Sequence, residues 1–137
     1  TLASSREQGS DGSVTDRLYD ASGLLAQETT TLKGRVTQTT SYQRDDKGRV
    51  VTRTTRSPAG IETWHDTWSE AGSLEREEYF KRGVRVKVTL YGERHTRTEE
   101  LYRGDGELFL KVFYDGDERR REEVYADGEL VHARDFP

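Results

Sequence analysis

Aromatic residues and glycines recur in this chain at a constant spacing of 23 residues. The positions that keep this spacing form three series: Tyr79, Tyr102 and Tyr125; Trp68, Tyr91 and Tyr114; and Gly60, Gly83 and Gly106. A fixed period of about 20–50 residues is typical of proteins that stack copies of one small structural unit. We therefore interpret these residues as structural positions of a repeat, and we expect the protein to present a surface rather than a catalytic pocket.

Each repeat has the composition of a β-hairpin. Turn pairs such as Ala59-Gly60 and Asp105-Gly106 separate runs rich in Thr, Val, Tyr and Arg, and these are the residue types of tight turns and of strands, respectively. No run has a sustained helical period. The sequence predicts an all-β fold, an antiparallel meander of about eleven strands in an extended, twisted, single-layer sheet.

The composition limits the core and the partners. Only 31% of the residues are hydrophobic, so the core is thin, and the 22 basic and 26 acidic residues are mixed along the chain. Nucleic-acid binding requires an electropositive surface, which this mixture does not provide. No apolar run reaches the length of about 20 residues that spans a bilayer. We expect neither a nucleic-acid partner nor an integral membrane segment.

The domain organisation is expected to be simple. Residues 1–12 are rich in Ser, Gly and charge and predict a flexible leader, whereas residues 13–137 predict a single β-hairpin repeat domain. The chain has no Met, which suggests a mature form or an excised segment. A tether behind a removed secretion signal would have such a leader, so we expect the cell envelope or periplasm, with the cytoplasm as the alternative.

The apolar face of the predicted sheet changes from copy to copy. Alternate residues of a strand point to opposite faces, and Val84, Val86, Val88 and Leu90 would share one face, whereas Leu108, Leu110 and Val112 would share the other. A β-bulge would correct this by shifting the register, but no residue marks a position for one. The stretch Val84–Leu90 is therefore expected to seed a small core or to meet a partner.

The chain offers little chemistry for catalysis or metal binding. His65, His95 and His132 do not have the spacing of a stacked site, and Asp-Gly pairs are explained by turn formation. Adjacent carboxylates such as Glu99 and Glu100 would point to opposite faces, and a thin sheet has no cleft to shift their pKa. We expect no enzymatic activity, no metal and no cofactor.

Exposed aromatic and apolar residues are the best candidates for a binding surface. Trp and Tyr are favoured anchors at protein interfaces, and the two tryptophans lie on one predicted strand face beside Asp66. The candidate contact residues are Trp64, Trp68, Val86, Val88 and Phe109.

The repeat resembles two known types. The segments Tyr102-Arg-Gly-Asp-Gly106-Glu-Leu108 and Tyr125-Ala-Asp-Gly128-Glu-Leu130, with Tyr114-Asp-Gly116, are similar to a bacterial variant of the MORN (membrane occupation and recognition nexus) repeat. Tyr19-Asp-Ala-Ser-Gly23-Leu-Leu25 resembles the YD repeat of RHS-type proteins. The chain departs from standard MORN repeats because it lacks their central Gly-x-Gly and their regular Trp. The resemblance implies an extended antiparallel sheet used for scaffolding or partner binding without catalysis.

Three functions remain open at this point. The first is a bacterial β-repeat module that binds another protein, as a scaffold of the cell envelope. The second is a carbohydrate-binding surface that uses the tryptophans and nearby acids. The third is an antitoxin or immunity protein, suggested by analogy with the bacterial repeat variant.

Overall fold

The structure, a computed structural model, describes residues 3–137. All regular secondary structure within these residues is β-strand, as the turn and strand patterns predict. The strands are β1 (Ser4–Gln8), β2 (Ser13–Tyr19), β3 (Leu25–Leu32), β4 (Arg35–Arg44), β5 (Val50–Arg56), β6 (Glu62–Trp68), β7 (Leu74–Lys81), β8 (Val84–Tyr91), β9 (Thr96–Tyr102), β10 (Leu108–Asp115), β11 (Glu118–Ala126) and β12 (Glu129–Asp135).

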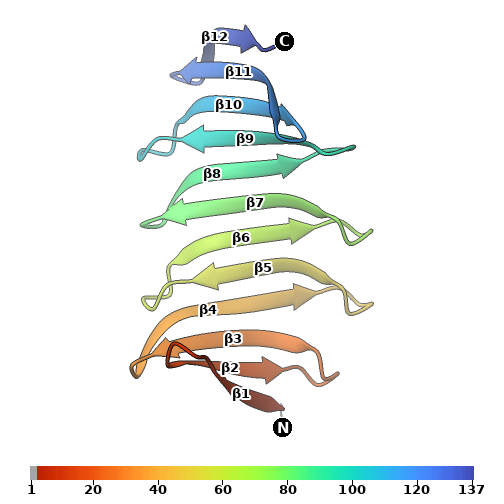
Figure 1. Cartoon of the computed structure of the whole chain (residues 1–137), viewed down its shortest axis with the longest axis vertical. Coiled ribbons are helices and arrows are strands. Elements are labelled where there is room, and N and C mark those ends of the chain that lie inside the picture. The colour runs from red at the N-terminus through yellow and green to blue at the C-terminus, as the bar shows by residue number, and fades with distance from the viewer. Residues whose placement is uncertain (1–2) are drawn as a thin grey trace.

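The strands form one open sheet in sequence order, and each strand pairs antiparallel with its neighbours along the chain. Figure 1 shows this single layer, with β1 at one end, β12 at the other and the chain termini at opposite ends. The predicted hairpin meander is thus confirmed, with 12 strands in place of about eleven.

The additional strand comes from the segment predicted as a flexible leader. Ser4–Gln8 forms β1, which pairs with β2 from Ser4 opposite Leu18 to Gln8 opposite Val14. Arg6 Nε donates to Asp16 Oδ1 at 2.7 Å across this pair. Cross-strand hydrogen bonds and charge pairs thus hold this segment in the sheet, although its composition alone did not suggest a strand. Thr1 and Leu2 of the predicted leader lie outside the described residues.

Both two-residue turns and longer turns join the strands. Between β7 and β8 the two-residue turn Arg82-Gly83 has positive φ at both positions, 54° and 78°, which is the geometry of a type I′ hairpin. Between β9 and β10 the N–H of Gly106 donates to the C=O of Arg103 at 2.8 Å, and Gly106 has a φ of 89°. Both repeat glycines therefore occupy conformations that other residues seldom adopt.

The bulges that the sequence did not locate are present in nine of the eleven strand pairs. In β8, Tyr79 pairs with Lys87 and Phe80 with Arg85, so Val86 is the additional residue. In β10, Phe109 is additional in the same way. Beyond each bulge, the residues point to the face opposite to the one that strict alternation predicts. The strict alternation expected along these strands is therefore wrong.

The small core lies on both faces of the sheet. Val88 is fully buried and Val112 is 3% exposed. Among residues 3–137, no other hydrophobic side chain is buried. Val88 is opposite Glu100, which is opposite Lys111, the neighbour of Val112. Cross-strand partners share a face, so these two valines lie on opposite faces, here named the Val88 face and the Asp66 face, which carries Val112.

Candidate functional site

A shallow hollow of about 150 Å³ lies on the Asp66 face, near the middle of the sheet. Strands β6 to β9 form it, because their register brings alternating aromatic and charged side chains opposite one another. The lining residues are Trp64, Glu77, Tyr79, Lys87, Thr89, Tyr91, Arg97 and Glu99. Five of these eight residues fall in the region from Trp64 to Leu90, and Tyr91, Arg97 and Glu99 follow it in the sequence.

One wall of the hollow rests on a buried carboxylate. Asp66 is 0% exposed and accepts hydrogen bonds from the indole Nε1 of Trp64 at 2.6 Å and from Arg53 Nε at 2.9 Å. The guanidinium of Arg53 also lies 5.3 Å from the ring centroid of Trp68. A buried carboxylate is stable only when paired and hydrogen-bonded, so Asp66, Arg53 and the two tryptophans form one interlocked unit, here named the Asp66 network.

Trp64 fixes the position of the next aromatic ring. Trp64 is directly opposite Tyr79 in the register of β6 and β7, and the two ring centroids lie 5.5 Å apart at an interplanar angle of 60°. Tilted pairs of this kind add about 0.5–1.5 kcal/mol beyond area burial. Tyr79 keeps 40% of its surface exposed, and it therefore presents a ring to solvent from a fixed position.

The far wall of the hollow carries a second exposed ring. Tyr91 is 38% exposed, and its hydroxyl donates to Glu77 Oε1. Partial burial, together with the hydrogen bond to Glu77 and its negative charge, raises the pKa of Tyr91 to about 12. The phenol of Tyr91 is therefore neutral at physiological pH and is held in orientation by a carboxylate.

The remaining charged groups of the hollow are close to groups of opposite charge. Glu99 lies 3.7 Å from Lys87 Nζ and 3.5 Å from Arg97 Nε. Arg97 also donates to the C=O of Gly116 at 2.7 Å, and its guanidinium lies 4.0 Å from the ring centroid of Tyr114. The hollow thus combines two carboxylates, two cations and two exposed rings, and its charged groups are held by neighbours on the same face.

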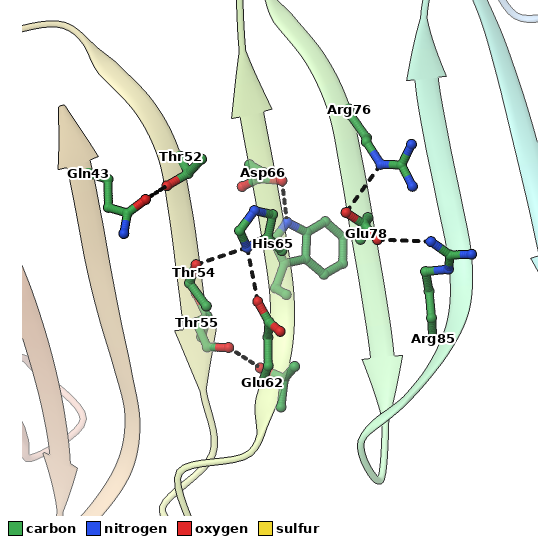
Figure 2. A network of polar contacts seen from close by, with 12 residues as sticks. Gln43, Thr52, Thr54, Thr55, Glu62, His65, Asp66, Arg76, Glu78 and Arg85 are labelled. Atoms are coloured by element: carbon green, nitrogen blue, oxygen red, sulfur yellow. Dashed lines mark hydrogen bonds and ion pairs between the residues drawn. The ribbon is translucent and has the colours of Figure 1, made fainter. Parts of the chain in front are cut away.

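The Val88 face carries a different network. Glu78 and Glu100 flank Val88 in the register. Burial opposes ionisation of Glu78, but the hydrogen bonds and charges of Arg76 and Arg85 outweigh it and hold the pKa of Glu78 below its usual range. Figure 2 shows the carboxylate of Glu78 between these two arginines. Val88 therefore lies between two carboxylates that are both paired with cations, Glu78 with Arg76 and Arg85, and Glu100 with Lys111.

His65 is fixed by neighbours on the same side. Its Nδ1 lies 2.9 Å from both Thr54 Oγ1 and Glu62 Oε1 (Figure 2). Strict alternation along β6 would place Glu62 on the face of Trp64, but the additional residue Thr63 at the bulge of β6 brings Glu62 to the face of His65. Within residues 3–137 no three His, Cys, Asp or Glu side chains gather as a metal site requires.

The predicted contact residues take different places. Trp64 lines the hollow and Trp68 joins the same network through Arg53. Val86 lies away from them, in an open depression of about 350 Å³ with Lys81, Arg82, Val84 and Gly104. Phe109 is half-buried, with the guanidinium of Arg103 5.4 Å from its centroid.

Val88 differs most from its predicted role as a contact residue. The side chain is fully buried, so it cannot meet a partner without rearrangement of its neighbours. The sequence also did not single out Glu77, Lys87, Arg97 or Glu99 as site residues. Charged residues make up 35% of the chain, and the only signal for these four is the strand register that gathers them on one face.

Comparison with known proteins does not assign this chain to a family. No protein-family model and no curated protein matches it. Among solved structures, it is similar to a chain in the crystal structure of accessory secretory protein 1, 2 and 3 from Streptococcus pneumoniae, with 13% identity and a TM-score of 0.39. The match covers 87% of this chain and 20% of that one. The described residues contain no helix that could cross a membrane.

Proposed function

We propose that the chain is a non-catalytic β-repeat module that binds another protein through the hollow on the Asp66 face, as a scaffold component of the bacterial cell envelope. The observation that carries this proposal is the pair of exposed rings, Tyr79 and Tyr91, held at fixed positions around a charge-balanced hollow. The resemblance to MORN-variant and YD repeats is in keeping with such a role.

The size of the hollow favours a protein partner over a small molecule. Pockets that enclose small ligands usually have volumes of about 300–1,000 Å³, whereas this hollow has about 150 Å³. Rigid Tyr rings and Arg side chains are enriched at the centres of protein interfaces. Lys87, Arg97 and Glu99 would offer a protein surface both donors and acceptors, with little freedom to lose on binding.

Site-specific photocrosslinking tests this proposal. A photoreactive phenylalanine analogue at position 79 is expected to capture a discrete protein in the native cell, and excess unlabelled chain should compete for it. The same analogue at Tyr19, which lies on the Asp66 face in β2 at a distance from the hollow, is the matched control. Equal capture from both positions, or none from position 79, would contradict the proposal.

Carbohydrate binding is the second candidate. It is favoured by one observation, namely that Tyr79 and Tyr91 flank Glu77 on an open surface, since sugar rings stack on aromatic faces while their hydroxyls bond to carboxylates. A glycan array separates the two functions. Signals that vanish in a Tyr79→Ala variant and persist in a Tyr19→Ala variant would favour a sugar ligand, and a blank array would count against it.

A further inference from the structure

Among residues 3–137, no strand pairs with the outer side of β1 or of β12, the two strands at the ends of the sheet. Every residue of β1 and every residue of β12 is exposed. Within residues 3–137, β1 pairs only with β2, and β12 only with β11. Unpaired N–H and C=O groups along an edge are templates for another strand, and the apolar side chains of Leu130 and Val131 on β12 are 49% and 60% exposed.

We propose that copies of this chain associate head to tail, with β12 of one copy pairing antiparallel with β1 of the next, so that the sheet continues from copy to copy. The direction of the strands permits this. All eleven neighbouring pairs are antiparallel, so β1 and β12 run in opposite directions. A second copy placed beyond β12 in the same orientation therefore continues the alternation.

The backbone groups that face outward determine which residues can pair. The N–H of Tyr19 donates to the C=O of Ala3, so the backbone N–H and C=O groups of the odd-numbered residues of β1 point toward β2. The backbone groups of Arg6 and Gln8 therefore point outward, away from β2. At the other end, the N–H of Phe136 donates to the C=O of Arg120. The backbones of Ala133 and Asp135 therefore point outward from β12.

One register satisfies these outward groups and also pairs opposite charges. With Arg6 opposite Asp135 and Gln8 opposite Ala133, the backbone hydrogen bonds of both pairs can form, and Glu7 comes opposite Arg134. Arg6 and Asp135 both lie on the Val88 face, and Glu7 and Arg134 both lie on the Asp66 face. Opposite charges directly across a strand pair stabilise it, and like charges destabilise it.

The new contacts would extend charge ladders that end at each edge of a single copy. At one edge Arg121 bonds to Asp135 at 3.0 Å, and at the other Arg6 bonds to Asp16 at 2.7 Å. The side chains of Arg6 and Asp135 are 73% and 76% exposed and can accept a second partner. In the assembly the ladder would run from Arg121 through Asp135 and Arg6 to Asp16 without interruption.

Pairing of identical edges is less favourable. Fully overlapped antiparallel pairing of β1 with a second β1 centres on Arg6 and places two guanidinium groups opposite each other. In the same pairing of β12 with β12, which centres on His132, the bulge at Val131 leaves Glu129 on the Asp66 face and Asp135 on the Val88 face, so no opposite charges come together. Like charges oppose the first arrangement, and no charge pair stabilises the second, so the complementary edges favour a second copy in head-to-tail order over a closed dimer of like edges.

Sedimentation velocity of the purified full chain over a concentration series tests this inference. The average mass is expected to rise with concentration and to continue past the dimer. Added salt should weaken the association because the pairs are exposed. A chain that stays monomeric throughout, or that stops at a dimer, would overturn the proposal.

Two variants on β12 make the test specific. Ala133→Pro removes an outward N–H at an edge, where proline is tolerated, and its β1 remains intact. It should therefore act as a chain terminator that shortens wild-type assemblies when added in a small proportion. Asp135→Arg opposes Arg6 with a like charge and should raise the concentration needed for association about tenfold, which corresponds to about 1.4 kcal/mol.

The control for the terminator is Ala21→Pro. Ala21 is exposed in the turn Asp20–Gly23, and the equivalent turn Ser57–Gly60 already holds Pro58 at this place with the same hydrogen bond between its ends. Ala21→Pro should associate like the wild type. If folded Ala133→Pro, checked by circular dichroism, leaves wild-type assemblies unchanged, β12 is not the joining edge and the proposal fails.

Discussion

The indole N–H of Trp64 donates to the carboxylate of Asp66 at 2.6 Å, beneath the hollow on the Asp66 face. The same carboxylate binds Arg53 and has no exposed surface. Trp64 in turn contacts the exposed ring of Tyr79. A buried charge thus sets the position of a surface ring, and the stability of the sheet and the geometry of the proposed binding surface depend on the same residue.

The first prediction concerns this carboxylate. Asp66→Ala leaves the indole N–H of Trp64 without a partner and Arg53 without its counter-charge. Because Arg53 is 39% exposed, water replaces part of the loss, and we expect destabilisation by about 2–3 kcal/mol. Urea unfolding measures it, with Asp46→Ala at an exposed turn residue as the control. A loss equal to that of Asp46→Ala would show that the Asp66 network contributes nothing.

The second prediction separates a core role from a contact role at Val88. Val88→Ala removes two buried methyl groups from the middle of β8, and we expect a loss of about 2 kcal/mol in the free energy of unfolding. Val131→Ala is the matched control, because Val131 is 60% exposed in β12 and should change stability by less than about 0.5 kcal/mol. Thermal or urea unfolding of the two variants gives the comparison. Similar small losses in both would mean that the core around Val88 is loose.

The repeat period predicted the strands and the turns, but it did not predict the faces on which the aromatic residues lie. Tyr79 and Tyr102 are 23 residues apart and point to opposite faces. Lys87 pairs with both Tyr79 and Leu101, so Leu101 shares the face of Tyr79, and Tyr102, the next residue, points the other way. Equivalence in the repeat therefore did not mean equivalence in space.

The cause lies in one turn. The β6–β7 pair has a bulge, with Glu75 as the additional residue, whereas the β8–β9 pair has none. The turn before β7 has a positive φ at Gly72 alone, but the turn before β9 has positive φ at both Arg94 and His95. A left-handed conformation at two successive residues other than glycine was not predictable from the period, since such residues seldom adopt it. The charged part of the hollow was missed because it depends on this register.

The third prediction concerns the pH dependence of Tyr91. Its pKa is raised to about 12, from an ordinary value of about 10. A raised pKa in the folded state means that the contribution of Tyr91 to stability is complete below about pH 10 and is lost as the pH rises to about 12. Glu77→Gln removes the negative charge beside the phenol and should bring the pKa of Tyr91 closer to 10.

Ultraviolet difference titration measures this shift, and subtraction of the Tyr91→Phe titration isolates the one phenol from the other tyrosines. Urea unfolding at several alkaline pH values should show a smaller loss of stability in Tyr91→Phe than in the wild type over the same interval. An unchanged titration of Tyr91 in Glu77→Gln would mean that burial alone raises the pKa, and it would remove Glu77 from the description of the hollow.

The last prediction compares two glycines in one turn. Gly106 has a φ of 89°, whereas the φ of Gly104 is not positive, and a methyl group added at either residue would meet no atom within 4 Å. Gly106→Ala therefore carries only the cost of a left-handed backbone, about 1–2 kcal/mol, and Gly104→Ala should leave stability unchanged or slightly higher. Thermal unfolding of the two variants measures the difference. Equal stability of the two would contradict the positive φ at Gly106 and the turn geometry that joins β9 to β10.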